Sequence, residues 1–481
     1  MEPTPGINDL RKLASHNFKA LVLPVNIQGV VMHNGMITKF RARALVASIA
    51  VVAIGAGVFS APAKAADPVT ITIWTFGDVI QRNLVAEYKA LHPEVTLQIK
   101  KSDLDPLDGT NMVTACTSKT GPDIVATEVS YSGYWRSYPK CFQDLRQMKT
   151  TGEPTAGIPT GQSATDIQKN YLAWRWQQGV AFDGSVIGIP TDVGGLEVAY
   201  RTDLFKKAGL PTDRAAVAKL WPTWDAFIAT GQKYNAKLTA AEKKAGVGFI
   251  DNAGTIYAAI MNQGTSKYYE NDGSETGKLI YATNPQVKLA WDTTIKATTA
   301  GIGTRIGQYT SDWNIGMNKG TFATILAPAW MMDYIKAQAP DTAGKWDIAS
   351  MPGGGGNQGG TQLGIPSYAQ NKQAAYDFLT WYLAPAQELK VFKSYGLFPA
   401  ASVLYNDPAL INFKDPFFNN APVGQIYAAG VQKLKPIFEG KLQRAIDTAI
   451  GAGLGRVAAK KQTADKSWAQ VLSDLKKVVN N

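Results

Sequence analysis

Histidine and cysteine are scarce in this 481-residue chain, which has three of the former and two of the latter. Beyond residue 65 only His92 remains, and it stands in a His-Pro pair that ends a predicted helix. A serine hydrolase needs a histidine base within reach of its nucleophile, so that class is disfavoured. The chain also lacks a Cys-x-x-Cys pair, which argues against a zinc site. We therefore expect no metal and no other cofactor.

Long apolar runs are also few. One uncharged apolar run stands at residues 44–59, and it is too short to span a bilayer comfortably. Basic residues precede it at 39–43 and small residues follow it at 63–65, which is the order of a secretory signal. We predict a signal peptide over 36–65, preceded by an over-extended reading frame at 1–35; the alternative is a membrane anchor. No cysteine stands at the cleavage site to accept a lipid, so a periplasmic protein without a lipid anchor is expected.

The charge balance is only mildly basic once the predicted signal is removed. Beyond residue 65 the chain keeps 42 of its 49 Lys and Arg and 36 of its 38 Asp and Glu, a net charge of about +6. The basic residues near the C-terminus are spread along predicted helices without interleaved aromatic residues. Solvated helix faces explain such a pattern better than nucleic-acid binding does, so no nucleic-acid partner is expected.

Both cysteines, Cys116 and Cys141, lie in the part that we expect to be exported. Oxidising compartments favour pairing of cysteines, which predicts a disulfide. The alternative is two unrelated buried thiols.

The length of the chain exceeds that of one compact domain, and its patterning begins as an α/β protein. Alternating strands at 69–74 and 95–100 flank a segment of helical spacing at 80–91, and this βαβ order predicts a lobe with a largely parallel sheet. The stretch 188–211 combines a turn, an extended run and a short helix, and we interpret it as a crossover between two lobes with a small-molecule cleft beside it. Residues 346–352 are a second crossover candidate.

Further elements follow the same logic. Residues 121–126 predict a turn followed by a buried strand, and residues 319–330 predict a strand that ends in a turn. Pro222 and Thr223 predict the start of a helix. Other helices are expected at 254–261, 285–297, 373–383 and 386–394, and from 331 onward. The glycine run 353–360 lacks the Gly-Lys-Ser/Thr of a phosphate loop and is interpreted as a flexible, solvent-exposed turn. The glycines at 451–455 lack the strand context of a dinucleotide site and are interpreted as a helix break.

Aromatic residues near predicted strand ends suit a polyhydroxy ligand, because sugar rings stack on Trp and Tyr. The available rings are Trp74, Phe76, Tyr131, Trp135, Tyr257 and Trp330, and each alone has the alternative of a place in the core. Trp174, Trp176 and Phe182 are expected in the core or on a lobe surface. A glycosidase would need two positioned carboxylates, for which the chain offers Glu128, Asp192 and Glu197, but nothing in their spacing singles out a pair.

A series of motifs, taken in order and with its spacing, carries a family resemblance. It consists of TIWTF at 72–76, LHPEV at 91–95, GPDIV at 121–125, GIPTDVGGLEVAYRTDLFKKAGLP at 188–211 with PTWDAF at 222–227, KGTFATILAPAW at 319–330, GGTQLGIP at 359–366 and FPA at 398–400. The series resembles the extracellular solute-binding proteins (family 1) of carbohydrate ABC importers, the class that includes maltose-binding protein, over about residues 69–470.

This resemblance implies a periplasmic-binding-protein type II fold, in which two α/β lobes are joined by a hinge of crossing segments. It assigns residues 66–190 and 353–398 to lobe 1, and 191–352 and 399–481 to lobe 2. The implied function is that of a monomeric, non-enzymatic component of an ABC importer, which captures a mono- or oligosaccharide between the lobes and delivers it to the membrane permease. The alternatives are a secreted carbohydrate-active enzyme and the same fold binding a polyol or another non-sugar solute.

The resemblance also implies a set of ligand contacts: Trp74, Phe76, Glu128, Tyr131, Asp192, Gly194, Asn252, Tyr257, Trp330 and Gln362. Trp330, after the 319–330 strand, is the strongest of these. The Gly194-Gly195 pair suggests close approach of the backbone to ligand beside Asp192. Gly194 stands where the maltose binder carries an acid, which argues against maltodextrin specificity, and the Cys116–Cys141 pair is not general to the family.

Overall fold

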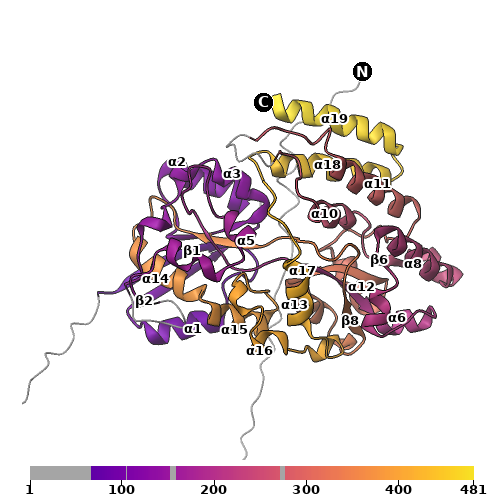
Figure 1. The fold of residues 1–481 in the computed structure, drawn as a ribbon, viewed down its shortest axis with the longest axis horizontal. Helices are drawn as coiled ribbons and strands as arrows, with labels where there is room; N and C mark the ends of the chain where they lie inside the picture. Colours follow the sequence, from indigo (N-terminus) through magenta and orange to yellow (C-terminus); the bar gives the residue numbers. More distant parts are fainter. Residues whose placement is uncertain (1–66, 105, 152–158, 271–276, 481) are drawn as a thin grey trace, which may run out of the picture. The chain divides into compact units, whose positions relative to one another are not determined.

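The computed structural model describes residues 67–104, 106–151, 159–270 and 277–480 (Figure 1). The predicted signal peptide and the segment before it lie outside these residues. No helix in the described part of the chain is long and apolar enough to cross a membrane.

The first sheet has the strand order β2 (Val95–Lys101), β1 (Val69–Thr75), β3 (Ile124–Glu128), β9 (Thr361–Gly364) and β4 (Ile189–Pro190). Strand β1 is parallel to both β2 and β3, whereas β9 is antiparallel to β3 and β4. Alternate residues of β1, such as Ile71 and Ile73, are fully buried, as the alternation predicted. The predicted largely parallel sheet is therefore confirmed, with β9 as its antiparallel member.

The second sheet has the strand order β6 (Gly248–Ile250), β7 (Phe322–Pro328), β5 (Leu196–Arg201) and β8 (Trp346–Ala349). Strands β6 and β7 are parallel, and β5 is antiparallel to both β7 and β8. Every residue of β5, β7 and β8 is buried. Such continuous burial is typical of strands covered on both faces.

Two crossovers join the sheets. The chain leaves the first sheet at β4 and enters the second at β5 through residues 191–195, and it returns from β8 to β9 through residues 350–360. The two crossovers pair with each other, because the Gln358 N–H donates to the Gly194 carbonyl at 2.7 Å and the Leu196 N–H donates to the Gly356 carbonyl at 2.9 Å. The first predicted crossover, 188–211, contains the connection at 191–195. The second, predicted at 346–352, covers β8 and only the start of the connection at 350–360.

Helices occupy most of the predicted positions (Figure 1). The predicted ones are α1 (Arg82–Leu91), α6 (Thr202–Lys207), α8 (Trp224–Ala236), α10 (Thr255–Met261), α11 (Pro285–Thr299), α13 (Ala329–Gln338), α14 (Lys372–Tyr382) and α15 (Pro385–Tyr395). Helices were also predicted near the C-terminus, where the structure has α17 (Val423–Val431), α18 (Gln443–Ala458) and α19 (Ala464–Asn480). The others are α2 (Met112–Ser118), α3 (Ser132–Arg136), α4 (Ala164–Ile167), α5 (Ala173–Gln177), α7 (Arg214–Ala218), α9 (Ala240–Lys244), α12 (Ser311–Lys319) and α16 (Pro408–Ile411). Thr223 caps α8 as expected, with its hydroxyl accepting from the Ala226 N–H at 3.2 Å.

The glycine run 353–360 is not the exposed turn that the sequence suggested. Gly355, Gly356 and Gly360 are buried within the second crossover. A Cβ atom added to Gly355 would lie 2.7 Å from the Gly430 carbonyl oxygen, closer than real Cβ contacts. These glycines allow the crossover backbone to pack against neighbouring segments, so the prediction of a solvent-exposed turn was wrong.

The glycines at 451–455 do not break a helix either, since they lie inside α18. A Cβ atom on Gly453 would stand 2.3 Å from Val471 Cγ2 of α19 and 3.0 Å from the Trp291 ring of α11. The absence of a side chain at Gly453 lets α18 approach both helices closely, and this packing compensates for the lower helix propensity of glycine. The sequence showed the weak helix former but not the helices packed against it.

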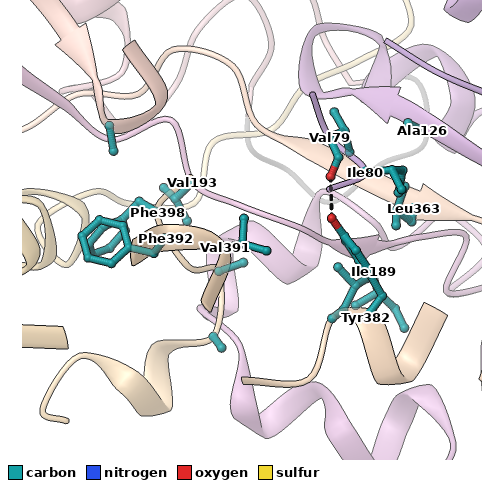
Figure 2. Close-up of a cluster of buried hydrophobic side chains, with 14 of the residues drawn as sticks. Val79, Ile80, Ala126, Ile189, Val193, Leu363, Tyr382, Val391, Phe392 and Phe398 are labelled. Carbon is teal, nitrogen blue, oxygen red and sulfur yellow. Dashed lines mark hydrogen bonds between the residues drawn. The ribbon is translucent and has the colours of Figure 1, made fainter. Parts of the chain in front are cut away.

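The larger hydrophobic core includes residues from the first sheet and the helices beside it. In Figure 2, Ala126, Ile189 and Leu363 from three strands lie near Ile80 and Tyr382. The Tyr382 hydroxyl donates to the Val79 carbonyl at 2.9 Å and accepts from the Gln81 N–H at 2.9 Å. The core thus buries a tyrosine whose polar atom is satisfied, as burial requires.

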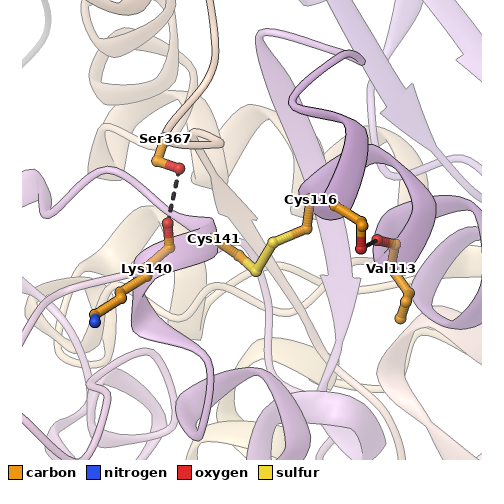
Figure 3. The surroundings of a disulfide bond; sticks show 6 residues. Val113, Cys116, Lys140, Cys141 and Ser367 are labelled. Carbon is orange, nitrogen blue, oxygen red and sulfur yellow. Dashed lines mark hydrogen bonds between the residues drawn. A yellow bond between two sulfur atoms is a disulfide. The ribbon is translucent and has the colours of Figure 1, made fainter.

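A disulfide joins Cys116 of α2 to Cys141, which lies 25 residues further along the chain (Figure 3). The two Cα atoms are 5.4 Å apart, a usual separation for a bonded pair. Beside the bridge, the Ser367 hydroxyl donates to the Lys140 carbonyl at 2.7 Å. The predicted pairing is confirmed, and it fixes α2 to the segment that follows α3.

Candidate functional site

Trp330 and Glu128 come from different sheets and meet at the second crossover. Trp330 lies in the first turn of α13, directly after β7, and Glu128 is the last residue of β3. A Cβ atom built on Gly359 would lie 3.6 Å from Trp330 Nε1 and 3.8 Å from Glu128 Oε1. Trp330 Nε1 also donates to the Gln358 carbonyl at 3.3 Å. The structure therefore brings two of the predicted contacts to one point on the chain.

The Glu128 carboxylate is held by local hydrogen bonds. Its Oε2 accepts from the Ser130 N–H at 2.8 Å, and the Ser130 hydroxyl donates to the same oxygen. Burial raises the pKa of Glu128, while these Ser130 hydrogen bonds act in the opposite direction. The carboxylate is thus fixed in position at the end of β3, where it can accept hydrogen bonds from a ligand.

Three of the predicted aromatic contacts, Trp74, Phe76 and Tyr131, pack against one small hydrophobic cluster that includes Val125 and Trp135. All three rings are half-buried. The Arg444 guanidinium of α18 lies 5.2 Å from the Tyr131 ring centroid, within cation–π range. Trp135 itself is almost fully buried, so it belongs to the core and not to an exposed platform.

The side chains of the predicted contacts Asp192 and Gln362 form hydrogen bonds within the first sheet and its crossovers. Asp192 Oδ1 accepts from the Thr191 hydroxyl at 2.6 Å and from the Thr361 N–H at 2.9 Å. The Gln362 side-chain amide donates to the Ser132 hydroxyl at 3.0 Å. Both side chains are almost fully buried.

Gly194 faces the second crossover. A Cβ atom there would lie only 1.9 Å from the Gln358 carbonyl oxygen. The glycine is therefore required by the pairing of the two crossovers, whereas the sequence suggested close approach to a ligand.

Asn252 and Tyr257 lie on the side of the second sheet. The Asn252 side-chain oxygen accepts from the Gly254 N–H at 2.8 Å, just before α10. The Tyr257 hydroxyl lies 3.2 Å from that of Tyr268, which donates to Asp447 Oδ1 at 2.5 Å. Both predicted contacts therefore have local structural partners on the side of the second sheet.

A small cavity of about 20 Å³ lies close to this site. Its lining residues come from segments attached to both sheets: Trp174, Gln178, Asn262, Lys267, Asn357, Leu434, Lys435, Ile437 and Glu439. Trp174 Nε1 and Asn357 Oδ1 are buried atoms without a hydrogen-bond partner among the described residues. The sequence placed Trp174 in the core or on a lobe surface and did not single out the other lining residues, because no local motif marks them.

Glu439 is the ionic centre of the cavity wall. Its Oε1 lies 2.9 Å from Lys267 Nζ, and its Oε2 accepts from the Gln178 side-chain amide at 3.2 Å. Gln178 Oε1 in turn accepts from Arg175 Nη1 at 2.8 Å. A hydrogen-bonded chain therefore runs from Lys267 through Glu439 and Gln178 to Arg175.

The buried Arg175 connects this chain to both crossovers. Its Nε donates to the Asp192 carbonyl at 2.9 Å, and its Nη2 donates to the Thr361 carbonyl at 2.5 Å. The same guanidinium thus holds the first crossover and the end of the second, and the cavity wall is tied to both.

The three carboxylates considered for a glycosidase have different surroundings. Glu197 is buried in β5, where its Oε2 accepts from the Met351 N–H at 2.8 Å, and Asp192 is held by Thr191 and Thr361. Only Glu128 of the three lies next to Gly359. Within the described ranges, no group of three or more His, Cys, Asp or Glu side chains is placed to hold a metal ion.

The model of a family described as bacterial extracellular solute-binding protein matches residues 83–416 of this chain. The lactose-binding protein of Rhizobium radiobacter is 27% identical over 435 residues, which cover 85% of this chain and 93% of that protein. The arabinooligosaccharide-binding protein of Bacillus subtilis (strain 168) is 28% identical over 213 residues, 41% of this chain and 45% of the relative.

Solved structures are similar over a comparable extent. A crystal structure described as extracellular solute-binding protein family 1 has a TM-score of 0.73 and 32% identity, and the match covers 85% of this chain and 99% of that one. The galacto-N-biose-/lacto-N-biose I-binding protein of Bifidobacterium longum, in complex with lacto-N-biose, has a TM-score of 0.66 at 17% identity and covers 86% of this chain and 97% of its own. The second similarity concerns the fold alone.

Proposed function

Because this chain belongs to the bacterial extracellular solute-binding protein family, we propose that it is the sugar-binding component of an ABC importer. In this proposal a mono- or oligosaccharide binds between lobe 1 (66–190 and 353–398) and lobe 2 (191–352 and 399–481). The loaded monomer then delivers it to the membrane permease. The match to a lactose-binding protein along 93% of that relative makes a lactose-like disaccharide the first sugar to test.

The observation that carries the proposal is the meeting of Trp330 and Glu128 at Gly359. An indole ring offers a flat apolar face for the C–H groups of a sugar, and a fixed carboxylate accepts hydrogen bonds from its hydroxyls. The two groups come from opposite sheets, so a sugar that contacts both would favour the state in which the lobes are close together. The ten residues expected to contact ligand remain part of this proposal.

A binding screen with product analysis tests the function. The Tm of the purified protein is measured with each of lactose, galactose, glucose, L-arabinose, maltose and glycerol in turn. Each ligand that raises the Tm is then examined by calorimetric titration. We expect stabilisation by at least one sugar with no change in the sugar recovered afterwards. Cleaved sugar would instead support the secreted enzyme, and stabilisation by glycerol alone would support a polyol-binding protein.

Trp330→Ala tests the site. If the ring stacks on the ligand, its loss should weaken sugar binding at least tenfold, which corresponds to about 1.4 kcal/mol. Trp330→Phe keeps an aromatic face and should lose less. Unchanged affinity in a folded Trp330→Ala protein would refute the role of this side chain.

We also propose that residues 36–65 are removed on export, leaving a periplasmic protein without a lipid anchor. N-terminal sequencing of the exported protein tests this, and a mature chain that begins near Ala66 is expected. A retained N-terminal segment would support the membrane-anchor alternative.

A further inference from the structure

We propose that the cavity lined by Trp174 and Asn357 is a subsite for one hydroxyl group of the bound sugar, with Trp174 donating to it and Asn357 accepting from it. The proposal rests on the proposed function and adds to it two recognition residues that neither the sequence pattern nor the family resemblance supplied.

The unpartnered atoms define the chemistry of the subsite. Trp174 and Asn357 are 8% and 7% exposed, and neither Trp174 Nε1 nor Asn357 Oδ1 has a hydrogen-bond partner in the described chain. A buried polar group without a partner is destabilising. The first atom can only donate and the second can only accept. A hydroxyl group does both, whereas an ammonium group only donates and a carboxylate only accepts.

The size of the cavity agrees with a group of this kind. Its volume of about 20 Å³ is enough for one water-sized group. A whole sugar ring does not fit, so the cavity would take a single hydroxyl that projects from a ring bound beside it.

The wall has three charged residues, of which Lys435 is exposed to solvent, and the other two favour a neutral group. Lys267 Nζ and Glu439 Oε1 form an ion pair at 2.9 Å, and the second Glu439 oxygen is occupied by the Gln178 amide. The two charges therefore compensate each other. A charged group in the cavity would have to be desolvated without a free counter-charge in this pair, which is costly.

A hydrogen bond links the subsite to the Trp330 site. Asn357 Nδ2 donates to the Gly359 carbonyl at 3.0 Å, and Gly359 is the residue next to both Trp330 and Glu128. Asn262, from the end of α10, donates to the Asn357 carbonyl at 2.9 Å and anchors the acceptor to the side of the second sheet. We therefore expect a sugar stacked on Trp330 to direct one hydroxyl into this cavity.

A neighbouring tryptophan supplies a matched control. Trp176 lies in the same helix, α5, and its Nε1 is also buried without a partner, but Trp176 does not line the cavity. Its ring packs 5.2 Å from that of Tyr171. The two Trp→Phe variants therefore remove the same N–H group at equivalent burial, and only one of them removes it from the subsite.

The test measures affinities for lactose and its monodeoxy analogues by calorimetric titration. If lactose does not bind, the sugar that binds most tightly in the screen takes its place and is tested with its own monodeoxy analogues. We call the unmodified sugar the parent sugar. For the wild type we expect one deoxy analogue to bind at least tenfold more weakly than the parent sugar. Trp174→Phe should bind the parent sugar about tenfold more weakly than the wild type does. Its affinity for that deoxy analogue should be little lower than its affinity for the parent sugar. Trp176→Phe should keep the wild-type affinities and ratios.

Each other outcome is decisive. If Trp174→Phe is folded, as its Tm and near-ultraviolet circular dichroism report, and keeps the wild-type ratios, the cavity holds a buried water only and the subsite is refuted. In that case sensitivity of binding to Trp330→Ala would still support the proposed function. If Trp174→Phe fails to fold, Asn357→Ala takes its place with the same expected ratios. If the wild type binds no sugar, both proposals fail together.

Discussion

Glutamine in place of Glu197 should remove a pH-dependent loss of stability. Glu197 lies in β5, is 2% exposed and accepts from the Met351 N–H at 2.8 Å. Burial raises the pKa of Glu197 from 4.5 to about 8, against the smaller lowering effects of the Met351 hydrogen bond and of Lys433. The folded protein therefore keeps a proton on Glu197 that the unfolded chain releases at a lower pH.

The sign and size follow from proton linkage. Below about pH 4.5 both states are protonated, and the stability contribution is at its most favourable. Between about pH 4.5 and 8 only the folded state holds the proton, so the free energy of unfolding falls by roughly 1.4 kcal/mol per pH unit. Above about pH 8 the loss is complete and constant. Glutamine is neutral throughout and keeps an oxygen that can accept from Met351, so the variant should lack this slope.

Urea denaturation of wild type and Glu197→Gln between about pH 5 and pH 8 measures the effect. The variant should gain stability relative to the wild type as pH rises, by a total on the order of a few kcal/mol. Glu242→Gln is the matched control. The hydrogen bond from Lys207 is the main cause that lowers the pKa of Glu242 to about 2, so both states are ionised in this window. Its stability curve should run parallel to the wild type, and a parallel curve for Glu197→Gln would refute the reasoning.

Two further predictions concern the scaffold. Replacing Cys116 and Cys141 by serine should destabilise the protein by about 3–4 kcal/mol on the chain-entropy model for a 25-residue separation, seen as a lower urea midpoint, and an unchanged midpoint would show that the bridge carries little stability. In α18, Gly453→Ala should lower the Tm, because the added Cβ would lie 2.3 Å from Val471 Cγ2. Gly451→Ala should instead raise the stability by up to about 1 kcal/mol, because nothing lies within 4 Å of its Cβ position. Tm shifts of the same sign in the two variants would contradict this packing.

The parts of the fold that depend on near neighbours in the chain could be predicted from the sequence. The alternation of β1, the cap at Thr223 and the helix end at His92 are local signals, and the structure confirms each of them. The roles of Gly453 and of the glycine run could not be predicted, because they depend on what packs opposite, and a sequence window shows only that a glycine is present.

The candidate site divides in the same way. Trp330 and Glu128 stand at strand ends, a position that sequence patterns can locate, and the structure brings them together. The cavity was missed because its members are distant in sequence: the ion pair of Lys267 and Glu439 joins residues 172 positions apart. Trp174 was expected in the core or on a lobe surface, because a tryptophan beside a cavity has the same sequence signature as one without a cavity.

The pairing of the two crossovers has a consequence for how such a protein can diverge. Gly194 and Gln358, and Leu196 and Gly356, are joined through main-chain atoms, which do not depend on the identity of most side chains. Mutations that alter the groups around a ligand can therefore accumulate while the connection between the sheets stays intact. Gly194 is one exception, since any side chain there would meet the Gln358 carbonyl. In relatives that bind a different sugar, we expect the residues around the paired crossovers to vary and Gly194 to be retained.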